Sequence, residues 1–287
     1  AMAFFNAWIF AWVEAIERRL TDVYMGARER WERDAAAVRA AEVRALLGGA
    51  GPADTATVSL RLGYELERFH VGYVIWSEEG GERPGDAGDL FAAMERAAAR
   101  IAESLGAGPP LTVAEGRHLA CWVGTRSASD FAQLQLPRCA NCRFSVAAGS
   151  PAHGVEGFVL SHREALQARR VAQLRGEGGH VRASFPNLSL EALLLENPEA
   201  ARRFAARELG PLAGADDATV RLASTLAIFL EEGESFARAA RRLGVHRNTV
   251  AYRVHRSETL LGRSLGERML ELRVALRLAR AVASQLI

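Results

Sequence analysis

Arginine side chains are concentrated in one short stretch near the carboxyl end of the chain. Between Ser235 and Arg256 there are six arginines and no acidic residue, whereas the whole chain of 287 residues has a formal net charge of only +2. Guanidinium groups make bidentate contacts with phosphates and carboxylates. This stretch therefore predicts a local basic patch for a polyanion, the alternative being an ordinary solvated helical face.

The residues around the arginines have the spacing of two helices joined by a glycine turn. We expect a helix over 219–231, a second over 236–243 capped by Ser235, and a third that opens at His246 or Asn248 and runs to about Leu261. Four apolar residues fall at inward positions, namely Leu243, Val245, Val250 and Val254. Helix, tight turn and helix is the geometry that lets a helix enter the major groove of DNA.

The start of the third helix is where side chains and backbone N–H groups can reach bases and phosphates. Arg247 suits guanine and Asn248 suits adenine, although Asn248 and Thr249 are equally suited to capping the helix. Tyr252 and Arg253, one turn further on, are expected to contact the groove or phosphates. The full set of candidate DNA contacts is His246, Arg247, Asn248, Thr249, Tyr252, Arg253 and Arg256, with Arg238, Arg241 and Arg242 on the preceding helix gripping the backbone.

Ahead of this region the pattern changes to that of an α+β domain. The run FHVGYVIW, Phe69 to Trp76, is β-branched and aromatic and predicts a buried strand. Further strands are expected over 111–114, 118–123, 144–148 and 181–185, and helices over 89–105, 129–136, 157–175, 188–196 and 198–209. This order predicts a ferredoxin-like α/β sandwich with trailing helices.

The first 34 residues carry an apolar stripe at a spacing of three and four, which predicts an amphipathic helix. The stripe consists of Phe5, Ile9, Trp12, Ile16, Leu20 and Val23. A second helix over 35–47 is expected to end at Gly48-Gly49. The stripe either packs on its own chain or pairs with the same helix of a second subunit.

Cysteine content and hydropathy exclude two classes of protein. Three cysteines are too few for a secreted disulfide framework, and the apolar opening is too short to span a bilayer. We expect a soluble, cytoplasmic protein without membrane association, and Ala1 before Met2 suggests a piece of a longer chain. Cys139 and Cys142 have zinc-knuckle spacing but supply two of the four ligands that zinc needs, so no metal and no cofactor is expected. A reversible disulfide between them remains an alternative.

Several of these motifs resemble one known family. The run His246-Arg247-Asn248-Thr249-Val250, followed by Tyr252-Arg253, resembles the C-terminal helix-turn-helix of the PucR/CdaR-type bacterial transcriptional regulators. Leu260-Leu261-Gly262 and LRVALRLARA at 272–281 are similar as well. Gly149, Gly154 and Gly157-Phe158 resemble part of that family's GGDEF-like central domain, and the segment 62–66 resembles the entry to it. Ala251 and Ser257 depart from the pattern, standing where a basic and an apolar residue are expected.

The resemblance covers roughly residues 40–283 and implies three parts. These are an N-terminal helical segment over 1–48, a degenerate GGDEF-like α+β domain with trailing helices over 49–212, and an all-helical DNA-binding domain over 213–287. It implies a transcriptional regulator that binds double-stranded DNA as a homodimer or higher oligomer, with an unidentified small-molecule effector.

The alternative is a nucleotide-binding, ligand-sensing or cyclase-like protein without a DNA role. Cyclase chemistry needs carboxylates that hold Mg²⁺, and the hairpin Ala114 to His118 has one acid and no Gly-Gly pair. No enzymatic activity is therefore expected.

Overall fold

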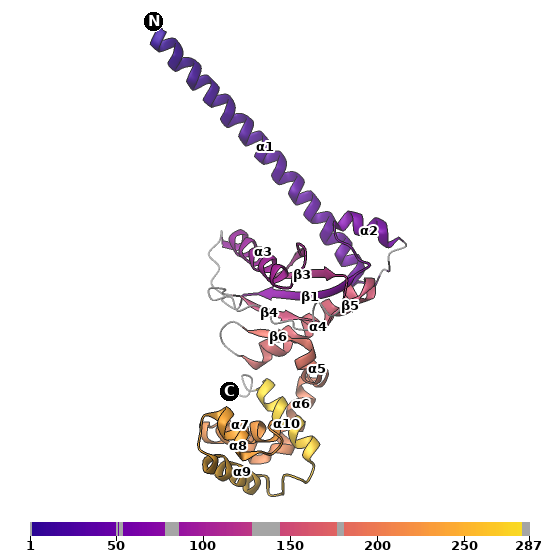
Figure 1. The fold of residues 1–287 in the computed structure, drawn as a ribbon, viewed down its shortest axis with the longest axis vertical. Helices are drawn as coiled ribbons and strands as arrows, with labels where there is room; N and C mark the ends of the chain where they lie inside the picture. The colour runs from indigo at the N-terminus through magenta and orange to yellow at the C-terminus, as the bar shows by residue number, and fades with distance from the viewer. Residues whose placement is uncertain are drawn as a thin grey trace.

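A mixed six-stranded sheet lies at the centre of the amino-terminal two thirds of the molecule (Figure 1). The computed structural model describes residues 2–49, 51, 54–77, 86–127, 144–176 and 181–282. The strands are β1 (Phe69–Trp76), β2 (Leu111–Glu115), β3 (His118–Thr125), β4 (Ser145–Ala148), β5 (Ala152–His153) and β6 (Arg182–Ser184). Their order is β2-β3-β1-β4-β6, with β5 beside one end of β1. All pairs are antiparallel except β4 with β6, so the expected α+β class is confirmed.

The two faces of the sheet are covered by different helices. Val71, Tyr73 and Ile75 of β1 pack with α3 (Asp86–Ser104), whereas Val74 and Trp76 point to the opposite face, where α4 (Gly154–Arg175) lies. Figure 1 shows these helices on opposite sides of the strands. A two-layer sandwich would keep both helices on one face. Here the sheet is buried from both sides, and apart from the buried His70 the residues of β1 are apolar or small.

Helix α4 approaches the sheet closely through two glycines. The N–H of Gly72 donates to Ser161 Oγ at 2.7 Å. A Cβ on Gly72 would lie 2.7 Å from the backbone nitrogen of His162, and one on Gly149 would lie 2.0 Å from the carbonyl oxygen of Ser161. Any larger residue at either position would push the helix off the sheet.

The amino-terminal segment is one helix and not two. Helix α1 runs without a break over Met2–Leu47, because no glycine or proline stands near residue 35 to end the first predicted helix. Only its last turns enter the core, through Val43 and Leu46, and the remainder projects away from the body (Figure 1). The side chains of Leu20 and Trp31 are 65% and 73% exposed.

A short helix that the sequence analysis missed follows α1. Helix α2 (Thr55–Leu62) begins at Asp54, whose carboxylate accepts from the N–H of Ala56 at 3.0 Å, and ends at Gly63 with φ of 62°. Both are ordinary capping signals. They were recognisable beforehand, since Asp54 and Gly63 enclose a good helical pattern.

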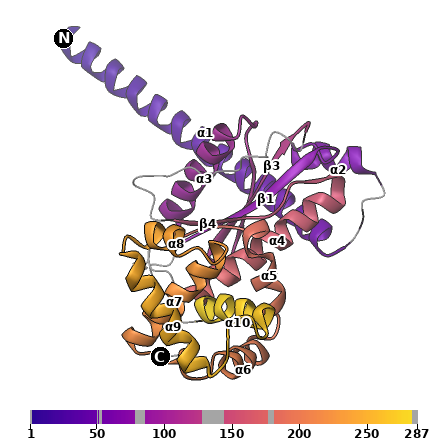
Figure 2. The ribbon, with the colours of Figure 1, turned by 60° about the horizontal axis from the view of Figure 1, so that its bottom comes forward.

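Helices form the rest of the chain. They are α5 (Phe185–Leu194), α6 (Pro198–Leu209), the 3₁₀ turn η2 (Gly210–Ala213), α7 (Asp217–Glu231), α8 (Phe236–Leu243), α9 (Arg247–Leu261) and α10 (Met269–Val282). One continuous apolar cluster extends from α4 through these helices to α9 and α10. The helical carboxyl-terminal region thus shares its core with the underside of the sheet, as Figure 2 shows for α10 beneath α4 and α5.

Some expectations concern residues outside those described, namely the helix predicted over 129–136 and the cysteines Cys139 and Cys142. Among the described residues, no helix combines the length and the apolar character needed to cross a bilayer.

A buried histidine lies where α4 meets the sheet. His70 is fully buried; its Nε2 lies 2.8 Å from the carbonyl oxygen of Leu66 and its Nδ1 lies 2.9 Å from the hydroxyl of Tyr64. Because a carbonyl only accepts, Nε2 carries the proton and Nδ1 accepts from Tyr64. Burial lowers the pKa of His70 to about 4, so the ring is neutral at pH 7.

This pKa predicts a loss of stability in acid. The unfolded chain protonates His70 near its ordinary pKa of 6.5, whereas the folded protein does so only near 4. The unfolded state therefore binds more protons in between, and the free energy of unfolding should fall from about pH 6.5 downward, by up to about 3 kcal/mol at pH 4. Urea denaturation at a series of pH values measures it. His70→Gln should lose less stability over this range, and parallel curves for the two proteins would contradict the assignment.

Candidate nucleic-acid interface

The turn between α8 and α9 is built by a glycine and closed by two backbone hydrogen bonds. Gly244 ends α8 with φ of 64°. Its N–H donates to the carbonyl of Arg241 at 3.4 Å, and that of Val245 donates to Ala240 at 3.1 Å. This left-handed termination redirects the chain so that α9 can start three residues later, at Arg247. The predicted bounds of α8 are confirmed.

His246 caps α9. Its Nδ1 accepts from the N–H of Asn248 at 3.2 Å, and the helix proper begins at Arg247. Capping by the side chains of Asn248 or Thr249 is therefore wrong: the N-cap is His246, and both residues lie within the first turn of the helix. The Asn248 side chain is left exposed at the helix start.

The inward face of α9 packs on α7 and α8. Val250 and Val254 are buried in the cluster that also holds Ala239 and Ala240 of α8, which confirms the predicted inward positions. Ser257 is fully buried too, and its hydroxyl donates to the carbonyl of Arg253 at 2.8 Å. Ser257 is therefore buried among apolar residues without an unpaired hydroxyl, because a backbone carbonyl of its own helix accepts the hydrogen bond.

Five of the candidate DNA contacts are exposed and make no side-chain hydrogen bond or ion pair within the part of the chain that the structure describes. They are Arg241 on α8 and Arg247, Asn248, Tyr252 and Arg256 on α9. On α9, Asn248, Tyr252 and Arg256 recur every four residues, so they share the side opposite Val250 and Val254. Arg247 lies nearer the side of the valines and is exposed at the first residue of the helix. Tyr252 is 70% exposed. These helices lie at the end of the molecule farthest from the start of α1 (Figure 1).

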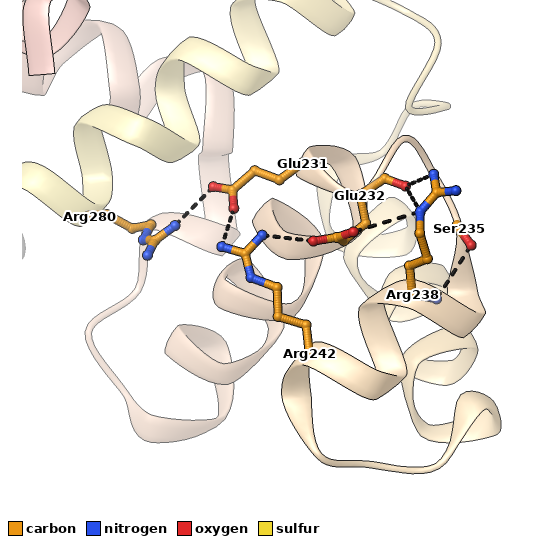
Figure 3. Close-up of polar contacts among 6 residues, drawn as sticks. All are labelled: Glu231, Glu232, Ser235, Arg238, Arg242 and Arg280. Carbon is orange, nitrogen blue, oxygen red and sulfur yellow. Dashed lines mark hydrogen bonds and ion pairs between the residues drawn. The ribbon is translucent and has the colours of Figure 1, made fainter. Parts of the chain in front are cut away.

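Three other candidate arginines are engaged within the protein. Arg242 lies 2.9 Å from carboxylate oxygens of both Glu231 and Glu232, and Arg238 donates its Nε to the carbonyl of Glu232 at 3.0 Å (Figure 3). Arg253 is half-buried, with Nη1 donating to Thr225 Oγ1 at 3.2 Å. The structure thus places these arginines against α7, away from the free side of α9.

Two buried carboxylates that position the helices escaped the sequence analysis. Glu208 of α6, 7% exposed, pairs with Arg263 at 3.4 Å and with Arg268 at 2.9 Å in the α9–α10 loop. Glu191 of α5 is buried as well and pairs with Arg277 of α10 at 3.1 Å. These contacts join residues more than fifty positions apart, so no local pattern signals them.

The sheet domain has a different set of polar groups. On its central hairpin, Glu115 lies 3.4 Å from His118 Nε2, and hydrogen bonding to His118 lowers the pKa of this carboxyl. Over the described ranges, no three His, Cys, Asp or Glu side chains come close enough to hold a metal ion.

The basic helix α9 follows a tight glycine turn and lies beside an α+β domain. This arrangement is that of a two-domain protein with a carboxyl-terminal helix-turn-helix. Two protein families match the chain: the PucR C-terminal helix-turn-helix domain over residues 222–278 and the GGDEF-like domain over residues 47–171. The chain therefore carries both domains of the PucR family, the GGDEF-like domain and the C-terminal helix-turn-helix, as the sequence motifs indicated.

Two curated proteins are similar to parts of the chain. The purine catabolism regulatory protein of Bacillus subtilis (strain 168) is 39% identical over 95 residues, which is 32% of this chain and 18% of that protein. An uncharacterized protein in the pkwA 5′ region of Thermomonospora curvata is 48% identical over 75 residues, 26% of this chain and 41% of that protein. The matched part spans less than half the length of either relative.

A solved structure is also similar, the regulator of polyketide synthase expression from Bifidobacterium adolescentis. It shares 18% identity, with 85% of this chain and 98% of that chain covered and a TM-score of 0.39.

The two kinds of arginine on α9 predict different effects on stability. Arg253→Ala removes the hydrogen bond to Thr225 and should lower the free energy of unfolding by about 1 kcal/mol. Arg256→Ala removes an exposed side chain from the same helix and should change it by less than about 0.5 kcal/mol. Urea denaturation compares the two variants, and equal losses would show that Arg253 does not support α9.

Proposed function

We propose that the protein is a DNA-binding transcriptional regulator whose helix α9 enters a major groove. The observation that carries this proposal is the exposed surface of α9, where Arg247 at the start of the helix and Arg256 on its outer side are exposed and unpaired among the described residues of a nearly neutral chain. Solvent-exposed arginines on one side of a helix-turn-helix supply the phosphate and base contacts that such domains use. The name of the Bacillus subtilis relative, a regulatory protein, supports the same function.

The proposed roles follow from chemistry and position. Arg247 and Asn248 stand in the first turn of α9, suited to guanine and adenine respectively. Tyr252 and Arg256, one and two turns further along, are suited to the groove wall and phosphates, and Arg241 to the backbone beside α8. His246 and Thr249 flank these positions. Arg253 is proposed to support α9 from within, because it already contacts Thr225.

We also propose that the GGDEF-like domain is a non-enzymatic part of the regulator. Its hairpin has a single carboxylate, Glu115, which is engaged by His118.

A small-molecule effector has a candidate binding site in a groove of about 630 Å³ beside α2, lined in part by Ser59, Tyr64 and Arg68.

DNA binding is expected to depend steeply on salt. Each phosphate neutralised contributes about −0.9 to the slope of log affinity against log salt. Arg247→Ala should weaken binding by about 1–3 kcal/mol and relax base preference at one position, whereas Arg256→Ala should weaken binding to all sequences and reduce the slope by about 0.9. Fluorescence anisotropy with a duplex selected from a random library measures both effects.

Arg203→Ala is the matched control, because Arg203 is an exposed arginine on α6 that pairs with Glu199. It should bind DNA as the parent does. A flat salt dependence, or α9 variants that bind like the parent, would contradict the proposal.

The exposed stripe of α1 is proposed to pair with a second copy of the chain. Ile16, Leu20, Val23 and Trp31 are exposed along the free part of a helix that touches the body only at its end. Most helical stability in proteins comes from packing of an apolar side against a partner. Helix-turn-helix proteins bind two half-sites as dimers. A parallel pair would keep both α9 helices at the same end of the assembly (Figure 1), facing one duplex.

Charge in this stripe should disrupt the pair. The double variant Leu20→Glu/Val23→Glu is expected to weaken dimerisation at least about a hundredfold, since unpaired charges would be buried between the helices. Light scattering after size exclusion measures the mass. Leu60→Glu, on an 84% exposed site of α2, should leave the dimer intact. A monomeric parent, or an unchanged mass in the double variant, would exclude pairing through α1.

A further inference from the structure

The guanidinium of Arg242 is held between two carboxylates. Its Nη1 lies 2.9 Å from Glu232 Oε1 and its Nη2 lies 2.9 Å from Glu231 Oε2 (Figure 3). The Arg242 side chain is 48% exposed, so it is open to solvent and is restrained by these two partners. The neighbouring Arg241, also exposed, has no such partner in the described part of the chain.

The same two carboxylates organise the arginines around them. Glu231 also lies 3.1 Å from Arg280 of α10, and Glu232 lies 3.7 Å from Arg238, which in addition holds the backbone carbonyl of Glu232. Both glutamates stand at the C-terminal end of α7, where the helix dipole disfavours negative charge. Their placement is unfavourable for α7 itself, and the surrounding arginines offset that cost.

A carboxylate and a phosphate compete for the same face of a guanidinium, because both accept two parallel N–H bonds. A DNA phosphate that contacts Arg242 must therefore displace Glu231 and Glu232, and the new contact replaces two existing ones. A phosphate that contacts Arg241 displaces only water and counterions. Adjacent arginines on one helix thus differ in what they can add to binding.

We propose that Glu231 and Glu232 limit DNA affinity by withholding Arg242 from the phosphate backbone. The proposal rests on the DNA-binding function proposed above and adds two affinity-setting residues that do not touch DNA. The affinity for DNA is then set by these two carboxylates as well as by the basic residues.

The test replaces both carboxylates with isosteric neutral side chains, Glu231→Gln/Glu232→Gln. The freed Arg242 should tighten binding about tenfold and steepen the slope of log affinity against log salt by about 0.9, as for one additional neutralised phosphate. Fluorescence anisotropy is measured on a labelled duplex that the parent protein selects from a random library, across a series of salt concentrations.

A mutant cycle separates release of Arg242 from a general loss of negative charge. Arg242→Ala should weaken binding more in the double-glutamine background than in the parent, whereas Arg241→Ala should weaken it equally in both. An equal effect of Arg242→Ala in both backgrounds would mean that the gain is only a general charge effect, and would overturn the proposal.

Thermal melting followed by circular dichroism checks folding, and Glu232→Gln alone serves if the double variant does not fold. A parent that binds DNA while the glutamine variants keep its affinity and salt slope would overturn this proposal only. A parent that binds no duplex would overturn the DNA-binding function as well.

Discussion

The packing of α9 on α7 and α8 is the interaction on which the proposed interface depends. Val250 and Val254 are buried in a cluster that continues through α10 and α4 to the sheet. Burying one side of a short helix fixes its rotation, so the opposite side is determined as well. The exposure of Asn248, Tyr252 and Arg256 is therefore a consequence of where two valines lie, whereas Arg247 is exposed because it is the first residue of the helix.

The arginines of this region fall into three structural situations despite their identical chemistry. Arg241, Arg247 and Arg256 are exposed and unpaired within the described chain, Arg242 is held by carboxylates, and Arg253 bridges two helices. Net charge alone does not distinguish these arginines from one another. The surrounding acids and hydroxyls decide which cations remain available to a partner, and those acids lie on α7, outside the basic stretch.

Local signals in the sequence predicted most of the elements, including the turn before α9 and the buried side of that helix. Gly244 and the inward valines indicated the turn and the buried side of α9, because caps and periodicity act over a few residues. They did not indicate that α3 and α4 cover opposite faces of the sheet, which depends on long-range packing. The pairing of Glu208 with Arg268, and of Arg253 with Thr225, was equally hidden, since these contacts join residues 60 and 28 positions apart, respectively.

The continuity of α1 has a mechanical consequence. The helix enters the core at Val43 and Leu46 without a break, so its outer part is fixed to the body in rotation as well as in direction. Each residue inserted into α1 between Leu20 and Val43 would turn the side bearing Leu20 by about 100° about the helix axis. Seven inserted residues would nearly restore the original orientation of that side relative to the body. A rotation of the outer part of α1 about its axis would therefore be passed on to the body of the protein. The number of residues in α1 sets the angle between the exposed apolar side of the helix and the body.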